Sequence, residues 1–388
     1  MIDASRELLR LVHPRRGHAM ARARRTDPLR EFEAARAAWA KLRSYWIAGW
    51  AQRKDELAAI ERAADAILTA DAPPREMQLV PLAAAERMLN GGATLVGCIA
   101  ARLDVGEALR VKAQSAEWKI TSGRKGKAWW WMLAGSTPPA TLVDAGWRAV
   151  RVAAATATDG QYADAREIAR ALRDAAATPE ARVRFDFAFP TEPEWAKDDL
   201  RALLAGPSFT QSVHVTLPLL ASVDDEALLT DAVGRLAGYQ AVLATHYACD
   251  VVAALPVDAA TRVLGVLAAR ALASRQHDDG ALRPLAIAMS AIRTEAMAHE
   301  LARWLRHPRF GRWVASYFER NHELARVAVG PLARGKSIAA DCARALLAAN
   351  ARAAEPDAGS IEDAPRLLAR PPWKAREPLE PRALATLP

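Results

Sequence analysis

Hydrophobic residues recur at three- and four-residue intervals through most of residues 222–350, which is the spacing that lines one face of an α-helix. The clearest apolar stripe is formed by Ala260, Val263, Leu264, Leu267 and Ala271. Short breaks with proline or glycine separate the runs, so the pattern predicts one helix after another. Helices of this length cannot each bury a face alone, and the stretch therefore predicts stacked helical repeats.

Residues that cap helices accompany several of the predicted starts. Ser222 precedes a group of acidic residues and is the predicted N-cap of the first helix in this stretch. Thr294 opens a later helix, and Ser337 opens the last one, which we expect to end at Asn350. Earlier in the chain, Thr191 and Glu194 have the spacing of a capping box.

Two patterns conflict between residues 178 and 190. Thr178 and Pro179 are typical of a helix start. An alternation typical of a strand follows, formed by Val183, Phe185, Phe187 and Phe189. We predict a helix that ends at Pro190, with a short strand as the alternative. Residues 209–216 are a second candidate for an extended segment, so the expected irregular region lies near residues 183–216.

Near the start of the chain, a seven-residue spacing relates three aromatic residues. Asp27 and Pro28 predict the start of a long helix. Phe32, Trp39 and Trp46 then fall on one stripe of that helix. Such a stripe packs in a core or against a second helix more often than it forms a ligand cage.

The most unusual local composition lies between residues 119 and 131. Two glycines are surrounded by Lys119, Arg124, Lys125 and Lys127, and three consecutive tryptophans begin at Trp129. A basic loop beside aromatic faces could hold a phosphate or stack a base. The alternative, which we favour, is an exposed loop that enters a helix and places at least one tryptophan in the core. The glycine spacing is not that of a Walker A motif.

The composition favours a wholly helical protein. Hydrophobic residues make up 51% of the 388 residues, and many of them are alanine, which favours helix. We predict an all-α fold in four regions. They are a basic N-terminal arm with a long helical hairpin (1–75), a helical middle region with the basic Trp-containing loop (76–210), the helical repeats (211–354), and a proline-rich linker or tail (355–388).

The chain is basic, with a net charge of +8. Residues 1–30 contain eight arginines, including Arg15 and Arg16, against three acidic residues. This segment could contact phosphates as a flexible arm. Acidic residues are interspersed through the chain, 45 against 53 lysines and arginines. Most of the basic charge is therefore expected to be ordinary surface charge.

Three cysteines lie far apart and do not form a disulfide framework, which favours a reducing compartment. No apolar run has the character of a signal peptide or of a membrane span. We expect a cytoplasmic protein with no membrane partner.

The candidate chemistry is sparse. His246 and Cys249 stand three residues apart beside Asp250, as two metal ligands would, but no second pair completes a site. No serine-hydrolase, kinase or dinucleotide motif is present. The sequence therefore predicts no metal, no cofactor and no catalytic residue, and an enzyme is the less favoured class.

Short motifs in the second half of the chain carry a resemblance. They are residues 302–308 (Ala-Arg-Trp-Leu-Arg-His-Pro), 330–336 (Gly-Pro-Leu-Ala-Arg-Gly-Lys), 343–347 (Ala-Arg-Ala-Leu-Leu) and 371–373 (Pro-Pro-Trp), with 189–195 (Phe-Pro-Thr-Glu-Pro-Glu-Trp) ahead of them. Their order and spacing are similar to a region of the bacterial MolR-like proteins, the molybdate metabolism regulator family. The resemblance implies HEAT-like helices ahead of a C-terminal domain of unknown function. The chain ends where that domain would begin, so we expect the domain to be absent.

Two functions from different classes follow. The first is a non-catalytic scaffold or regulatory protein, a HEAT-like α-solenoid whose concave face binds a protein partner. The second is a basic nucleic-acid-binding regulator. Its candidate contacts to nucleic acid or another anion are Arg15, Arg16, Lys119, Arg124, Lys125, Lys127 and Trp129.

Overall fold

The computed structural model describes residues 2–3, 5–18, 32–40, 54–71, 73, 79–80, 83, 94–116, 118–125, 128–135, 143–274 and 280–354. Within these ranges the elements are helices, one β-hairpin and one isolated β-bridge. The predicted helical fold class is confirmed, and the hairpin is an addition to it. The chain divides into two compact units, residues 1–314 and 315–388. Two of the predicted region boundaries, after residues 75 and 210, fall inside the first unit.

The hairpin separates two groups of helices in the first unit. Before it come α1 (Arg6–Leu11), α3 (Lys54–Thr69), α5 (Thr94–Arg102) and α6 (Val105–Ala116). The hairpin itself pairs β1 (Trp118–Lys125) with β2 (Ala128–Gly135). After it come α7 (Ala145–Thr156), α8 (Asp159–Asp174), α9 (Pro179–Ala188), α10 (Pro193–Leu204), α11 (Ser208–Gln211), α12 (Val213–Thr216), the 3-10 helix η1 (Leu217–Ala221), α13 (Glu226–Arg235), α14 (Tyr239–Ala244), the 3-10 helix η2 (Thr245–Tyr247), α15 (Ala248–Ala254), α16 (Val257–Leu272), α17 (Arg283–Ser290) and α18 (Glu295–Ala302). The remaining helices are α19 (Gly311–Arg320), α20 (His322–Ala333) and α21 (Ile338–Ala354).

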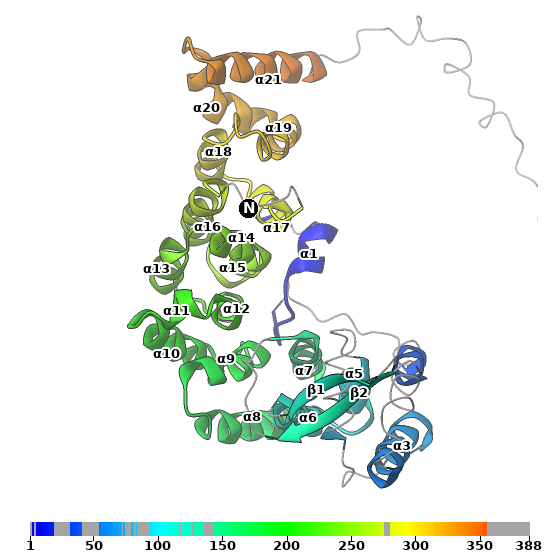
Figure 1. Ribbon diagram of the computed structural model, residues 1–388. Coiled ribbons are helices and arrows are strands. Elements are labelled where there is room, and N and C mark those ends of the chain that lie inside the picture. The colour runs from blue at the N-terminus through cyan, green and yellow to red at the C-terminus, as the bar shows by residue number, and fades with distance from the viewer. Residues whose placement is uncertain are drawn as a thin grey trace, which may run out of the picture. The chain divides into compact units, whose positions relative to one another are not determined.

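From α7 to α18 the first unit is built from two rows of helices (Figure 1). We call α7, α9, η1, α15 and α17 the inner row, in which each element packs against the next. The outer row consists of α10, α13, α16 and α18, packed in the same manner. Contacts between α9 and α10, and between α15 and α16, join the rows. In these two pairs, helices that follow one another in the sequence lie side by side in different rows.

A helix, α9 (Pro179–Ala188), forms in this stretch, so the strand alternative is wrong; the helix ends two residues before the predicted Pro190. The Thr178 hydroxyl accepts a hydrogen bond from the Ala181 amide at 3.3 Å and caps the helix. The alternation arises because α9 is buried on all sides, with Arg184 and Asp186 buried between the aromatic residues. A helix without a solvated face shows no helical period in its hydrophobicity. Residues 209–216 are also largely helical, in α11 and α12.

Some predicted helix starts are confirmed and others are corrected. The predicted apolar stripe of α16 is buried, and the Thr294 hydroxyl caps α18. The N-cap of α13 is Asp225, whose carboxylate accepts from the Leu228 amide at 3.0 Å. Ser222, the predicted cap, is fully buried beside η1 three residues before that position.

The predicted capping box before α10 is wrong. Glu192 occupies the N-cap of α10 and forms no capping bond with its side chain. The Thr191 hydroxyl is hydrogen-bonded to the hydroxyl of Tyr162 in α8 instead. A tertiary partner has thus replaced the local one that the spacing suggested.

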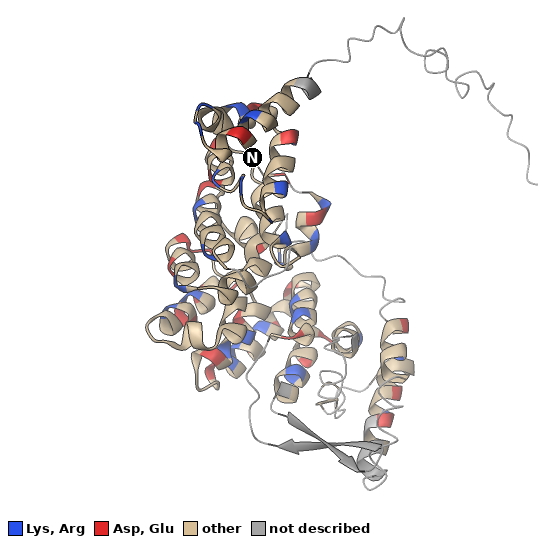
Figure 2. Cartoon of the chain, turned by 45° about the horizontal axis from the view of Figure 1, so that its top comes forward, with Lys and Arg blue, Asp and Glu red and all other residues tan. Residues whose placement is uncertain are grey.

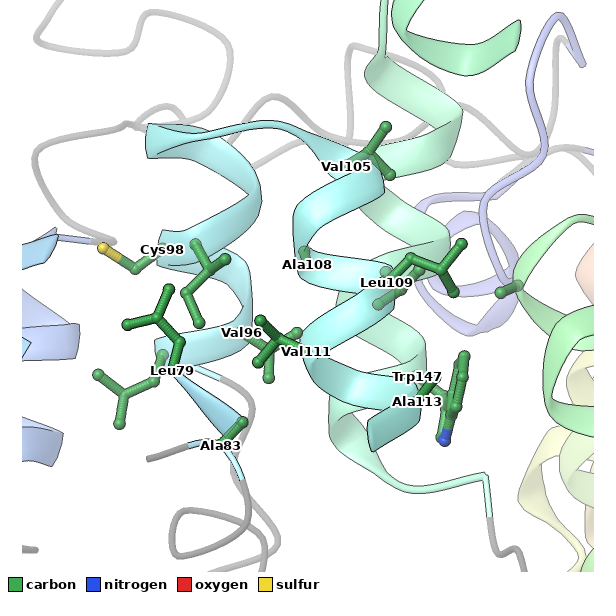
Figure 3. Close-up of a cluster of buried hydrophobic side chains, with 14 of the residues drawn as sticks. Leu79, Ala83, Val96, Cys98, Val105, Ala108, Leu109, Val111, Ala113 and Trp147 are labelled. Carbon is green, nitrogen blue, oxygen red and sulfur yellow. The ribbon is translucent and has the colours of Figure 1, made fainter. Parts of the chain in front are cut away.

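One hydrophobic core of the first unit joins α5, α6, α7 and α9. Figure 3 shows Val96 of α5 and Val111 of α6 in this cluster, with Trp147 of α7. Trp39, in the helical residues 32–40, belongs to it as well, so this part of the predicted aromatic stripe is core. Residues 27–28 and Trp46 lie outside the described residues.

In the second unit, α20 packs against α21. The amide of Asn350 is buried and its Nδ2 donates to the Phe318 carbonyl at 3.1 Å. Asn350 therefore does not end the last helix, which continues to Ala354. Cys342 is exposed on α21, whereas the other two cysteines are buried in the first unit. The predicted proline-rich tail, 355–388, lies outside the described part of the chain.

A buried ion pair fixes the start of α7. Lys112 of α6 is 1% exposed, and its Nζ donates to Asp144 Oδ2 at 2.6 Å. The other oxygen of Asp144 accepts from the Gly146 and Trp147 amides at 2.9 and 3.2 Å. A buried ammonium group is costly unless it is paired. Asp144 therefore caps α7 and neutralises Lys112 with one carboxylate.

Replacing Gly146 with alanine is expected to lower the free energy of unfolding by about 1–3 kcal/mol. The new Cβ would lie 2.7 Å from Lys112 Cε, so the end of this buried lysine side chain must shift, which disturbs its bond to Asp144. Urea unfolding followed by circular dichroism measures the change. Gly160→Ala in α8 is the matched control, because a Cβ there meets no atom within 4 Å. Equal stability of the two variants would contradict the argument.

Candidate functional site

Segment 2–18, by which we mean the described residues 2–3 and 5–18, lies along the inner row (Figure 1). Ile2 forms a β-bridge with Ile292, just beyond α17. Next, α1 packs against α17 and α15. The residues after α1 reach η1, α7 and the start of α8. The segment therefore follows the inner row in the direction opposite to the sequence order of its helices.

His13 is bound at the middle of this path by one buried carboxylate. Its backbone N–H donates to Asp250 Oδ1 at 2.8 Å, and its Nδ1 lies 2.8 Å from Asp250 Oδ2. Asp250, in α15, is fully buried. The imidazole meets the Phe187 ring edge-on at 5.2 Å and stacks on Tyr247 at 5.8 Å between ring centroids. Burial raises the pKa of Tyr247 to about 12, so its hydroxyl is neutral at physiological pH.

Arg151 of α7 binds three separate parts of the chain. Its Nε donates to the Pro14 carbonyl at 2.8 Å, and its two terminal nitrogens donate to the carbonyls of Phe187 and Ala221 at 3.0 Å each. Its guanidinium carbon lies 4.6 Å from the centroid of the Phe187 ring. Burial lowers the pKa of Arg151 to about 9, against the opposing effect of Asp250. The group therefore stays charged at neutral pH.

Arg15 and Arg16, two predicted contacts to nucleic acid, use their guanidinium groups within the chain. Arg15 is 9% exposed and donates to the Ala221 carbonyl at 2.8 Å, the same oxygen that Arg151 binds. Burial lowers the pKa of Arg15. Arg16 donates to the Ala157 carbonyl and to Asp159. These bonds hold segment 2–18 against η1, the end of α7 and the start of α8.

The other predicted contacts gather on the β-hairpin. In its register Arg124 lies opposite Trp129, Lys125 opposite Ala128, and Lys119 opposite Ala134. The predicted loop leading into a helix is therefore wrong, since the tryptophans belong to β2. Tryptophan, isoleucine and threonine before a short turn and three tryptophans after it are typical of a hairpin, and this signal was available in the sequence. Lys127 lies outside the described residues.

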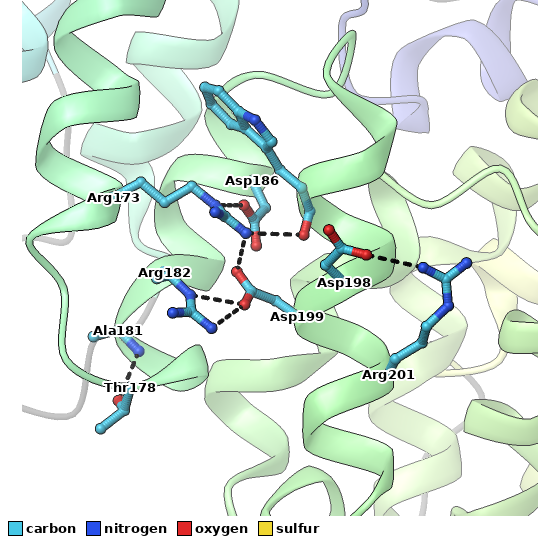
Figure 4. Close-up of polar contacts among 9 residues, drawn as sticks. Arg173, Thr178, Ala181, Arg182, Asp186, Asp198, Asp199 and Arg201 are labelled. Atoms are coloured by element: carbon cyan, nitrogen blue, oxygen red, sulfur yellow. Dashed lines mark hydrogen bonds and ion pairs between the residues drawn. The ribbon is translucent and has the colours of Figure 1, made fainter.

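A second buried charge cluster joins α8, α9 and α10 (Figure 4). Arg173 donates to Asp186 at 2.9 Å and to Asp199 at 2.7 Å, and Arg182 donates to the second oxygen of Asp199 at 2.7 Å. Both carboxylates are buried. Burial, and then the neighbouring charge of Asp199, raise the pKa of Asp186 well above its ordinary value. The cluster holds three helices together and places a carboxyl group with a raised pKa, that of Asp186, between them.

The three side chains considered as metal ligands do not meet at one point. Asp250 binds His13, and the Cys249 thiol donates to the Pro284 carbonyl at 3.6 Å. Burial raises the pKa of that thiol, which makes it a poor nucleophile and ligand. Within the ranges given above, no group of three or more His, Cys, Asp or Glu residues is placed to hold a metal ion.

No protein-family model matches the chain, and neither the curated proteins nor the solved structures contain a match. The resemblance to MolR-like proteins therefore stays a prediction from its short motifs. None of the helices in the described part of the chain is long and apolar enough to cross a membrane.

The sequence analysis missed the role of three residues, His13, Arg151 and Asp250. The signal of Arg151 and Asp250 is a single charge in an apolar helical run, as in Ala-Val-Arg-Val-Ala around Arg151 and Cys-Asp-Val-Val around Asp250. A charge on such a face must find a partner inside the protein. The pattern does not say which partner, because His13 is 237 residues from Asp250.

Replacing Arg151 with methionine is expected to lower the free energy of unfolding by about 3–5 kcal/mol. The methionine keeps much of the volume but leaves the carbonyls of Pro14, Phe187 and Ala221 without this donor. Urea unfolding measures the change. Arg148→Met on the same helix is the control, since Arg148 is exposed and its loss should matter by less than about 0.5 kcal/mol. Similar losses in both variants would contradict the role given to Arg151.

Replacing Asp186 with asparagine is expected to change how stability depends on pH. The folded state binds the Asp186 proton more tightly than the unfolded chain does, because its pKa is raised on folding. Its contribution is therefore complete below the unfolded pKa of about 3.9 and is lost as pH rises through the raised value. Asparagine is neutral throughout, so thermal unfolding between pH 4 and 8 should show a smaller loss with rising pH. Asp198→Asn, at an exposed pair with Arg201, should keep the wild-type slope.

Proposed function

We propose that the protein is a non-catalytic scaffold, a HEAT-like α-solenoid that binds a protein partner along its inner row. The observation that carries the proposal is the arrangement of α7 to α18, in which two rows of helices lie side by side and each helix packs against the next in its row. Stacked repeats of this kind present long surfaces for partners. The MolR-like motifs favour the same class, since that family has HEAT-like helices.

The use of buried charges supports a scaffold over an enzyme. Lys112, Arg151 and Arg173 each bind oxygen atoms from other helices or segments. Asp250 and Asp199 accept from partners within the chain. Groups that are committed to such bonds position helices rather than substrates. Catalytic groups, in contrast, need access to the molecule that they act on.

A nucleic-acid-binding regulator is the second candidate, and the hairpin register favours it. Arg124 and Trp129 occupy opposite positions, which brings a basic and an aromatic residue to one place on a two-stranded ribbon. Such pairs bind backbone phosphates and stack on bases. Against this candidate, Figure 2 shows Lys and Arg interspersed with Asp and Glu along the described helices.

Two measurements on the full chain distinguish the candidates. Affinity capture from lysate with mass spectrometry should enrich a protein partner relative to a helical bait of similar charge. Recovery of nothing above that background would count against the scaffold. In parallel, labelled DNA and RNA are titrated across a salt series.

For the scaffold we expect no nucleic-acid binding near physiological ionic strength. Binding that persists there and falls steeply with salt would favour the regulator, because released counterions set that slope. In that case Arg124→Ala with Lys125→Ala should weaken binding by about tenfold or more, whereas Arg303→Ala with Arg306→Ala, at exposed positions, should change it little.

A further inference from the structure

The inner row binds segment 2–18 partly through the segment's main chain. Asp250 of α15 accepts from the backbone N–H of His13, and Arg151 of α7 donates to the backbone carbonyl of Pro14. Residues 13–15 are not part of a helix. Side chains from two helices of the inner row thus bind the backbone N–H of His13 and the backbone carbonyl of the next residue, Pro14. Bonds of this type can hold an extended peptide whatever its side chains are.

Side-chain contacts at the same place add selectivity. The imidazole of His13 fits between Phe187 and Tyr247 and reaches the second oxygen of Asp250. Arg15 reaches the Ala221 carbonyl. The residue between them is a proline, which lacks an N–H donor and so leaves none unpaired. The surface therefore suits a peptide in which a residue with a ring and a hydrogen-bond donor is followed by proline and then by arginine.

The N-terminal part of segment 2–18 is attached by the β-bridge of Ile2, by the fully buried Leu8 and by two exposed ion pairs. Glu7 pairs with Arg283 and Asp3 with Arg293, and all four side chains are more than 40% exposed. Exposed pairs of this kind contribute about 0–1 kcal/mol each. The polar contacts to buried groups of the inner row come from residues 13–15.

We propose that this part of the inner row is a recognition groove for an extended peptide, occupied here by the chain's own residues 12–16. A partner protein binds the groove with a segment of the same chemistry, a ring-bearing donor followed by proline and arginine. The proposal rests on the scaffold function and names the surface and the partner chemistry for it.

The chain's own segment competes with any such partner. A tethered segment has an effective concentration of order millimolar, and occupancy reduces apparent affinity in proportion to the fraction of open groove. Weakening the segment without altering the groove should therefore strengthen binding of an external peptide. A contact that served only to hold the fold together would not respond in this way.

The probe is a fluorescent synthetic peptide with the sequence of residues 8–18, and its anisotropy is measured with the full chain. The variant His13→Ala with Arg15→Ala leaves the groove side chains unchanged, and it should bind the peptide about tenfold or more tightly than wild type does. Adding Asp250→Asn to the double variant should weaken its affinity for the peptide about tenfold. A peptide of scrambled sequence should bind neither protein. No binding of the correct peptide to the folded double variant overturns the proposal.

If circular dichroism shows that the double variant does not fold, Glu7→Arg replaces it. That change repels Arg283 at the exposed end and leaves residues 12–16 unchanged. It should strengthen peptide binding by about threefold relative to wild type, and no gain would overturn the proposal. Light scattering accompanies both experiments. Dimers that form by exchange of segment 2–18 would overturn it as well, in favour of a second copy as the occupant.

The outcome is separable from that of the scaffold proposal. If affinity capture returns a partner while the peptide binds no variant, the groove is overturned and the scaffold function stands. If the peptide binds as expected while capture returns nothing, the groove stands and the scaffold function loses its support.

Discussion

A guanidinium group that has no contact with water must find its acceptors within the protein, and Arg151 places that requirement at the centre of the first unit. It satisfies the requirement with carbonyls from segment 2–18, from α9 and from η1. None of these oxygens belongs to α7, so the helix is positioned only when all three parts are present. Asp250 has the complementary requirement and meets it with His13. The inner row and segment 2–18 therefore form one structure, in which each completes the other's polar contacts.

The alanine-rich helices explain why such contacts are needed. Small side chains let helices approach closely, but they do not strongly favour one relative position of two packed helices over another. Directional polar contacts help to select that position. Lys112 with Asp144 fixes α6 against α7, and Arg173 with two aspartates fixes α8 against α9 and α10. We infer that the buried charges serve the choice of packing more than its strength, since buried ion pairs add little net stability.

Local signals in the sequence predicted much of the fold. Thr178, Thr294 and Ser337 mark helix starts, because capping bonds form within a few residues. The stripe of α16 follows directly from its one buried face. Where a tertiary contact overrides a local one, as at Thr191 with Tyr162, the prediction is wrong. The contacts of segment 2–18 could not be predicted from local patterns, since its hydrogen bonds to the rest of the first unit join residues 137 to 290 positions apart. The sequence alone therefore could not show that Arg15 and Arg16 bind carbonyls of distant residues.

The path of segment 2–18 also has a consequence for synthesis of the chain. Its residues leave the ribosome before their partners, which lie as late as Arg293. At roughly 5–20 residues per second, the last of these partners follows roughly 15–60 s later. Helices of both rows can pair with their neighbours during that interval, because contacts between sequential helices are local. Segment 2–18 thus gains its native surroundings only after the last of these partners has been made.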